Sequence, residues 1–128
     1  MGLYDMILIK DNHIALFGSP SAAVREARAH SDLKIMVEMD TLEDLENVLK
    51  AEPDYILLDN MTSDILSIAV QKTDNICQAK GWKRPELEAS GGVSLETISE
   101  IARSGVDRIS IGALTNGAGS VDIGLDFE

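Results

Sequence analysis

The chain has 128 residues, 45% of them hydrophobic and 26% charged, a composition typical of a soluble globular protein with one domain over residues 1–128. Its formal net charge of −11 argues against nucleic acid and anionic membranes as partners. It has no apolar run near the ~18 residues of a membrane span, no secretory signal pattern and a single cysteine, Cys77. We therefore expect a reduced, cytoplasmic protein without an internal disulfide.

The first half of the chain alternates short apolar runs with helical patterns. Strands are predicted over residues 6–9 and 35–39. Between them, the serine and proline at 19–20 are typical of a helix N-terminus. After the second strand, Asp40 with Glu43 three residues later resembles a capping box, so a helix is predicted to begin at Asp40 or at the threonine after it.

The second half continues the alternation. Its apolar runs predict three further strands, over residues 55–58, 86–89 and 108–111. A helix is predicted from Ser63, with Ile65, Ile68 and Ala69 facing the core, and another from Ser94. The tail from residue 121 could add one more strand. Strands that alternate with helices in this way indicate a parallel α/β sheet with right-handed crossovers.

Polar residues and glycines lie at the end of every predicted strand. The first three strands carry or lead into Lys10, Glu38 and Asp59, and the last two lead into Ser90–Gly91 and Gly112–Ala113. Because the carboxyl ends of parallel strands meet at one edge of a sheet, these residues should gather there.

A ring of mixed charge beside two glycine turns indicates a sugar-phosphate site. Glycines let a phosphate approach backbone N–H groups, while carboxylates can meet ribose hydroxyls and a hard cation such as Mg²⁺. Each residue also has a purely structural explanation. Asp40 fits a helix cap, Asp59 fits a cap or a turn, and Lys10 fits a side chain that reaches solvent. Their common edge, more than any one residue, favours a site.

Several segments together resemble a known family. They are "GLYDMILIKDNHI", "VEMDTLEDLE", "ILLDNM", "LEASGGVSLETI", "GVDRISIGALT" and "DIGLDF". In this order they are similar to the C-terminal barrel domain of quinolinate phosphoribosyltransferase, also called nicotinate-nucleotide pyrophosphorylase (carboxylating). The resemblance implies a partial TIM-barrel-like (β/α) barrel with about five parallel strands and four helices. It also implies that the family's N-terminal sandwich domain and early barrel strands are absent from this chain.

The resemblance implies a reaction in NAD biosynthesis. Quinolinate and phosphoribosyl pyrophosphate would give nicotinate mononucleotide, carbon dioxide and pyrophosphate, with Mg²⁺, in a dimer or higher oligomer. Lys10 would hold a quinolinate carboxylate, while Glu38 and Asp59 would bind the ribose hydroxyls and the metal-pyrophosphate region. The 5′-phosphate would lie in a cradle formed by Ser90, Gly91, Gly112 and Ala113. Asp11, Asn12 and His13 are expected to form a loop that positions Lys10, and His13 receives no separate role.

Departures from the family pattern qualify these expectations. Asn116 and Gly117 stand where the family usually has a His and often a Ser, and Met36 replaces a Glu. The chain starts just after the family's usual His-Arg pair. A rim with one cation, Lys10, and two carboxylates should repel such anionic substrates, so we expect the chain alone to be inactive.

Two structural alternatives follow from an incomplete barrel, which would have two open edges and an uncovered apolar face. The chain either pairs with another copy or is a piece of a longer protein, and the second is favoured. Two functional alternatives also stay open. One is a non-catalytic remnant that binds phosphate or a partner chain. The other is a different sugar-phosphate barrel enzyme, such as an aldolase that forms a Schiff base on Lys10.

Overall fold

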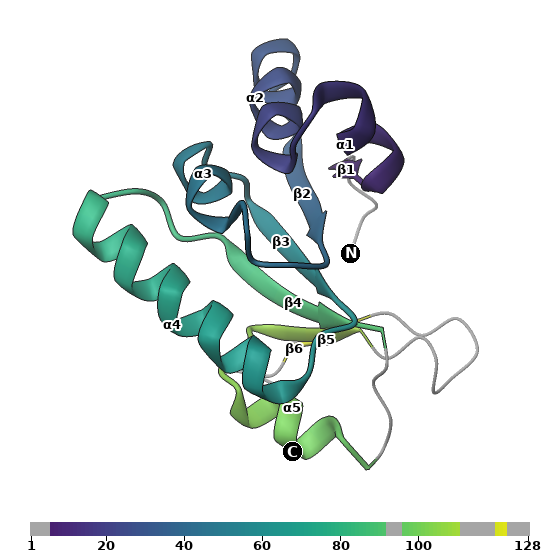
Figure 1. The fold of residues 1–128 in the computed structure, drawn as a ribbon, viewed down its shortest axis with the longest axis vertical. Helices are drawn as coiled ribbons and strands as arrows, with labels where there is room; N and C mark the ends of the chain where they lie inside the picture. Colours follow the sequence, from purple (N-terminus) through teal and green to yellow (C-terminus); the bar gives the residue numbers. More distant parts are fainter. Residues whose placement is uncertain (1–5, 92–95, 111–119, 123–128) are drawn as a thin grey trace.

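The structure is a computed structural model that describes residues 6–91, 96–110 and 120–122 (Figure 1). Its strands are β1 (Met6–Ile9), β2 (Lys34–Met39), β3 (Tyr55–Asp59), β4 (Glu86–Ser90), β5 (Arg108–Ser110) and β6 (Ser120–Asp122). Its helices are α1 (Asp11–Phe17), α2 (Pro20–His30), α3 (Leu45–Lys50), α4 (Ser63–Lys80) and α5 (Ile98–Arg103). None of these described helices is long and apolar enough to cross a membrane.

The strands form one open sheet in the order of the chain, from β1 to β6. The pairs β1–β2, β2–β3, β3–β4 and β4–β5 are parallel, as predicted, and β6 runs antiparallel to β5. The predicted α/β architecture of five parallel strands alternating with helices is therefore confirmed. In the described residues the sheet does not close, and its two edges are β1 and β6.

A layer of helices covers one face of the sheet. Helices α2, α3, α4 and α5 lie in sequence along that face, each in contact with the next (Figure 1). Alternate strand residues are fully buried beneath them, among them Ile35, Val37, Ile56, Leu58 and Leu87. Burying a side chain of this size contributes about 1.5–3 kcal/mol, so this layer holds the strands in place.

The opposite face of the sheet is only partly covered by the described residues. Leu8 is 38% exposed, and Met36, Tyr55 and Leu57 are half-buried on the same face. The period of two along each strand sends these side chains away from the helices. This face and the two sheet edges match the expectation for an incomplete barrel.

The first helix was missed by the sequence reasoning, which assigned Asp11, Asn12 and His13 to a loop. They form the first turn of α1, and the N–H of Ile14 donates to the carbonyl of Lys10 at 3.0 Å. The helix is one short element of 7 residues, too short to give a recognisable apolar stripe. It closes at Gly18, whose φ of 92° lies in the left-handed region that ends helices.

The helix after β2 begins later than predicted. Residues 40–44 form bends and turns, and α3 starts at Leu45, so Asp40 is not a helix cap. The side chain of Asp44 serves a different helix. Its Oδ2 accepts a hydrogen bond from the backbone N–H of Ser21, at the start of α2, at 3.0 Å.

Helix α4 begins at Ser63 as predicted, but a different stripe faces the core. Ile65 and Ile68 are 39% and 41% exposed, whereas only Ala69 of the predicted inward set is buried. The buried stripe consists of Leu66, Ala69, Thr73 and Cys77. This stripe continues along the whole helix, whereas the predicted one ends after two turns. The predicted start of the next helix, Ser94, lies outside the described residues.

Candidate active site

Four of the predicted site residues lie at the carboxyl edge of the sheet. Lys10 directly follows β1, Glu38 is the next-to-last residue of β2, and Asp59 and Ser90 end β3 and β4. The arrows of β2, β3 and β4 point toward the same edge (Figure 1). The sequence therefore placed these residues correctly, while Gly112 and Ala113 lie outside the described residues, as do Asn116 and Gly117.

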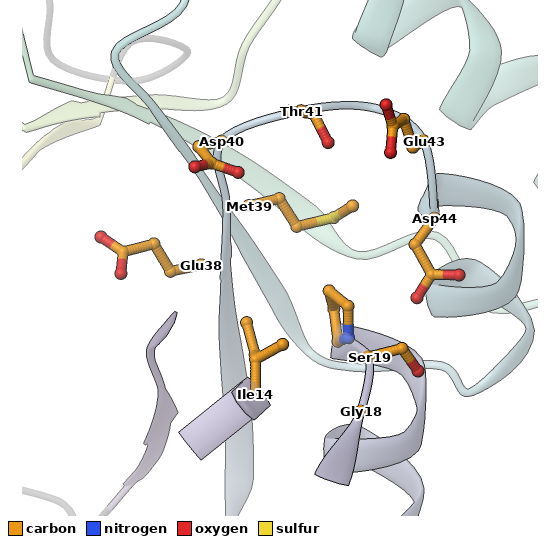
Figure 2. Close-up of a pocket in the computed structure, with 10 residues that line it drawn as sticks. Ile14, Gly18, Ser19, Glu38, Met39, Asp40, Thr41, Glu43 and Asp44 are labelled. Atoms are coloured by element: carbon orange, nitrogen blue, oxygen red, sulfur yellow. The ribbon is translucent and has the colours of Figure 1, made fainter. Parts of the chain in front are cut away.

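Glu38 projects from the face of the sheet opposite the helices. Its neighbours Val37 and Met39 are buried under the helices, whereas Glu38 is half-buried. Figure 2 shows the side chains of Glu38 and Met39 leaving β2 on opposite sides. In the register of β1 against β2, Ile9 is paired with Val37, so the residues that directly follow this pair are Lys10 and Glu38.

Asp59, Ser90 and Gly91 form a compact cluster at the ends of β3 and β4. Asp59 and Ser90 are direct partners in the sheet register, and the Ser90 hydroxyl donates to Asp59 Oδ1 at 3.3 Å. The N–H of Asn60 donates to the carbonyl of Ser90 at 2.7 Å. Asn60 and Gly91 both have left-handed backbones, with φ of 58° and 74°. Two adjacent strands thus turn sharply at the same place, with a carboxylate and a hydroxyl between them.

A cavity of about 460 Å³ lies between the end of β2 and the start of α2 (Figure 2). Four of its lining residues are acidic, Glu38, Asp40, Glu43 and Asp44, and the side chain of Glu38 points away from those of Glu43 and Asp44 in Figure 2. Burial acts to raise the pKa of Asp44, but hydrogen bonds from Asn47 and Ser21 outweigh it and lower that pKa. Asp44 therefore stays ionised, and a cavity of this charge disfavours a bare anion.

The carboxylates at this edge do not form a metal cage by themselves. In the described part of the chain, no group of three or more His, Cys, Asp or Glu side chains is placed to hold a metal ion. In the register, Glu38 is opposite Leu57, two residues before Asp59. Mg²⁺ commonly takes one or two protein carboxylates, several waters and the phosphates of a substrate. Glu38 and Asp59 fit such a partial site.

The open face also carries an ion pair that the sequence reasoning missed. Glu88 is only 7% exposed, and Arg108 Nε lies 3.8 Å from its Oε1. Glu88 precedes Ser90 by two residues, so counting by twos from the predicted site would have found it. Arg108 adds a cation to this face, which also bears Lys10 and, at the start of β2, Lys34. Because the charge of Arg108 is offset by that of Glu88, the net charge of the remaining side chains near the site, Lys10, Glu38 and Asp59, stays negative.

Comparison with known proteins identifies the family. The family model for the quinolinate phosphoribosyl transferase C-terminal domain matches residues 1–126. A nicotinate-nucleotide pyrophosphorylase [carboxylating] from Mycobacterium leprae is 44% identical over 99% of this chain and 43% of its own length. A probable enzyme of the same name from Methanocaldococcus jannaschii is 40% identical over 98% of this chain and 44% of its own.

Solved structures agree with the sequence relatives. The nicotinate-nucleotide pyrophosphorylase from Ehrlichia chaffeensis is 37% identical, with a TM-score of 0.74 over 94% of this chain and 42% of that one. The enzyme of the same name from Francisella tularensis is 36% identical, with a TM-score of 0.72 over 94% of this chain and 41% of that one. The chain thus spans less than half the length of these relatives. It belongs to the quinolinate phosphoribosyl transferase family and corresponds to that family's C-terminal domain.

Proposed function

We propose that this chain is the C-terminal barrel portion of a quinolinate phosphoribosyltransferase acting in NAD biosynthesis. The complete enzyme would convert quinolinate and phosphoribosyl pyrophosphate to nicotinate mononucleotide, carbon dioxide and pyrophosphate. The observation that carries the proposal is the family match over residues 1–126, joined to the placement of Lys10, Glu38, Asp59 and Ser90 at one sheet edge. We place the protein in the cytoplasm, as one domain over residues 1–128.

Each side chain has a role in this proposal. Lys10 is exposed at the end of β1 and would bind a carboxylate of quinolinate. Glu38 and Asp59 would bind the ribose hydroxyls. Ser90 and Gly91 would meet the 5′-phosphate together with Gly112 and Ala113. Lys10 at one end of this edge would thus hold quinolinate, and the residues on the next three strands would hold the ribose phosphate beside it.

The chemistry suits carboxylates better than a protein nucleophile. As pyrophosphate leaves, the ribose carbon gains positive charge, and Glu38 and Asp59 can stabilise that charge through space. The nitrogen of quinolinate then forms the new bond to this carbon and becomes cationic. The bond from the ring to the carboxylate next to this nitrogen then breaks, carbon dioxide leaves, and the electron pair stays on the ring carbon, which takes up a proton from solvent. Mg²⁺, when bound, neutralises charge on the departing pyrophosphate.

The isolated chain should not complete this reaction. Both substrates are strongly anionic, and beyond the first residues of β2 and β4 the described open face carries Glu38, Asp59 and Glu88 against Lys10 and Arg108. Arg108 is already placed against Glu88. We propose that the further cations come from an N-terminal half like that of the longer relatives, or from another copy of the chain. The complete enzyme would be a homo-oligomer.

A chimera tests the proposed function. The C-terminal portion of the Mycobacterium leprae relative is replaced by this chain, and nicotinate mononucleotide is measured with quinolinate, phosphoribosyl pyrophosphate and Mg²⁺. We expect turnover by the chimera, none by the chain alone, and loss of turnover with Lys10→Ala. A folded chimera that binds phosphate without turnover would favour the non-catalytic alternative. Borohydride trapping of a ketose phosphate on Lys10 would favour an aldolase.

A further inference from the structure

We infer that Gly91 is a positioning residue for the Asp59 carboxylate, and that its missing side chain makes room for Asp59 Oδ1. The sequence suggested another use for this glycine, the approach of a phosphate to the backbone. The steric relationship with Asp59 stands on the geometry alone. Its consequence for the reaction rests on the proposed function of this edge.

The space beside Gly91 is already filled by the end of β3. A Cβ built on Gly91 would lie 2.9 Å from Asp59 Oδ1, 3.3 Å from the N of Asn60 and 3.5 Å from its Cα. A carbon and an oxygen that are not bonded to each other do not settle at 2.9 Å. A side chain at position 91 therefore requires the Asp59 carboxylate to move.

Asp59 Oδ1 is the end of a flexible side chain, and the cost of moving it is the loss of its partner at Ser90. Its Oδ1 accepts the Ser90 hydroxyl at 3.3 Å, and Ser90 is the residue directly before Gly91. The backbones are joined as well, because the Asn60 N–H donates to the Ser90 carbonyl at 2.7 Å. The ends of β3 and β4 are thus linked twice, once through the Asp59 side chain and once through the backbone of Asn60. Rotation of Asp59 away from position 91 would break its bond to Ser90.

The left-handed backbone of Gly91 adds a second constraint that must be separated from the first. Its φ is 74°, a conformation that any L residue adopts at a cost. Gly81, the residue that ends α4, provides a matched control because its φ is 72° and no atom lies within 4 Å of its would-be Cβ. Gly81→Ala reports backbone strain alone, whereas Gly91→Ala reports strain together with the contacts to Asp59 Oδ1 and to the backbone of Asn60, of which Asp59→Ala removes the first.

A double-mutant cycle on the 128-residue chain tests the inference. The folding equilibrium constant is measured by urea unfolding for Gly91→Ala and Gly81→Ala, each with Asp59 present and with Asp59→Ala. We expect Gly91→Ala to lower this constant about tenfold more than Gly81→Ala does, and this excess to fall to within about threefold once Asp59 Oδ1 is removed. Equal losses at the two glycines, or an excess that persists with Asp59→Ala, would overturn the inference.

The same cycle in the chimera separates a positioning role from a phosphate-binding role. Misplacing a catalytic group by about 1 Å can cost on the order of 10²-fold in rate. We expect Gly91→Ala to lower kcat by about that factor, and to add less than about threefold to the loss caused by Asp59→Ala. If Gly91→Ala lowered kcat by the same factor in the Asp59→Ala chimera as in the unsubstituted one, Gly91 would act independently of Asp59. If the unsubstituted chimera had no turnover, the proposed function would fail, and the unfolding cycle would still decide the steric coupling.

Discussion

Asp107 repeats, between β4 and β5, the contact that Asp54 makes between β2 and β3. Each aspartate directly precedes its strand and accepts, through Oδ2, the N–H of a residue in the preceding parallel strand. The distances are 2.9 Å from Ile35 to Asp54 and 2.8 Å from Leu87 to Asp107. Each also donates its own N–H to the carbonyl of that same residue, at 3.0 and 2.8 Å. The two contacts fix the starts of the strands, at the sheet edge opposite the site.

Basic side chains complete both contacts. Arg28 and Lys83 bind the Asp54 carboxylate at 3.2 and 2.8 Å. Arg84 binds Asp107 at 2.9 Å and Asp74 at 2.6 Å. In parallel α/β folds the amino edge of the sheet serves stability and the carboxyl edge serves chemistry. Substitutions at these aspartates should therefore change stability and leave the site geometry intact.

Removing the Asp107 carboxylate should destabilise the chain more than removing Asp74. Asp107→Ala leaves the N–H of Leu87 without its acceptor, so we expect a loss of about 1–2 kcal/mol in the free energy of unfolding. Asp74 makes an exposed ion pair to the same Arg84, and Asp74→Ala should cost under about 1 kcal/mol. Urea unfolding of both variants measures the difference. Equal losses would mean that the arginine pairing, and not the strand contact, carries the stability.

Acid should weaken the fold through Asp54. Burial acts to raise the pKa of Asp54, but hydrogen bonds from Lys83, Ile35 and Arg28 outweigh it and lower the pKa from 3.8 to about 2. The carboxylate therefore contributes stability above pH 3.8, and this contribution is lost as the pH falls through about 2.

The expected size of this acid effect is about 1–2 kcal/mol, since the Asp54 side chain is 9% exposed but its basic partners face solvent. Unfolding free energies at pH 2 and pH 5 are compared for the unsubstituted chain and for Asp54→Asn. The variant should lose less stability between these two pH values, because one titrating group has been removed. An identical loss in both would show that other carboxylates govern the acid response.

A buried hydroxyl in α4 offers a stabilising substitution. Thr73 is fully buried, and its Oγ1 has no hydrogen-bond partner among the described residues. Thr73→Val keeps the shape and removes a desolvated polar atom, so we expect a gain of about 1 kcal/mol. Thr62→Val is the matched control, because Thr62 Oγ1 caps the same helix by accepting from the N–H of Ile65 at 3.3 Å. That variant should lose about 1 kcal/mol, and a loss at both positions would contradict the prediction.

The sequence predicted the sheet well because its signals are local and repeated. Apolar runs bounded by polar residues located the first five strands to within one or two residues, and their parallel direction followed from the alternation with helices. The site edge followed in turn, since Glu38, Asp59 and Ser90 are at strand ends. Such a placement needs only the direction of parallel strands, not any side-chain contact.

The failures occurred where contacts distant in sequence decide the structure. Asp40 and Glu43 fit a capping box, yet the chain continues to Leu45 before the helix begins, and Asp44 instead binds the start of α2. The strand period of two places Glu88 on the same face as Ser90, but its burial follows from its position between neighbouring strands. The close approach of Gly91 to Asp59 is also invisible in the sequence, because 31 positions separate Asp59 from its partner Ser90.

Glu38 and Glu43 line the same acidic cavity but should differ in their effect on turnover. Glu38 projects from β2 on the face shared with Asp59, whereas Glu43 is exposed in the turn before α3. Because Glu38 is proposed to meet the ribose as positive charge develops, Glu38→Gln should lower kcat/KM of the chimera by on the order of 10²-fold. Glu43→Gln removes the same charge without that contact. Its kcat/KM should stay within about threefold of the unsubstituted chimera, since an exposed charge is screened by salt. Steady-state rates with phosphoribosyl pyrophosphate as the varied substrate measure both. Equal losses would show that the cavity acts through its total charge, and a loss at Glu43 alone would move the ribose contact to the turn before α3.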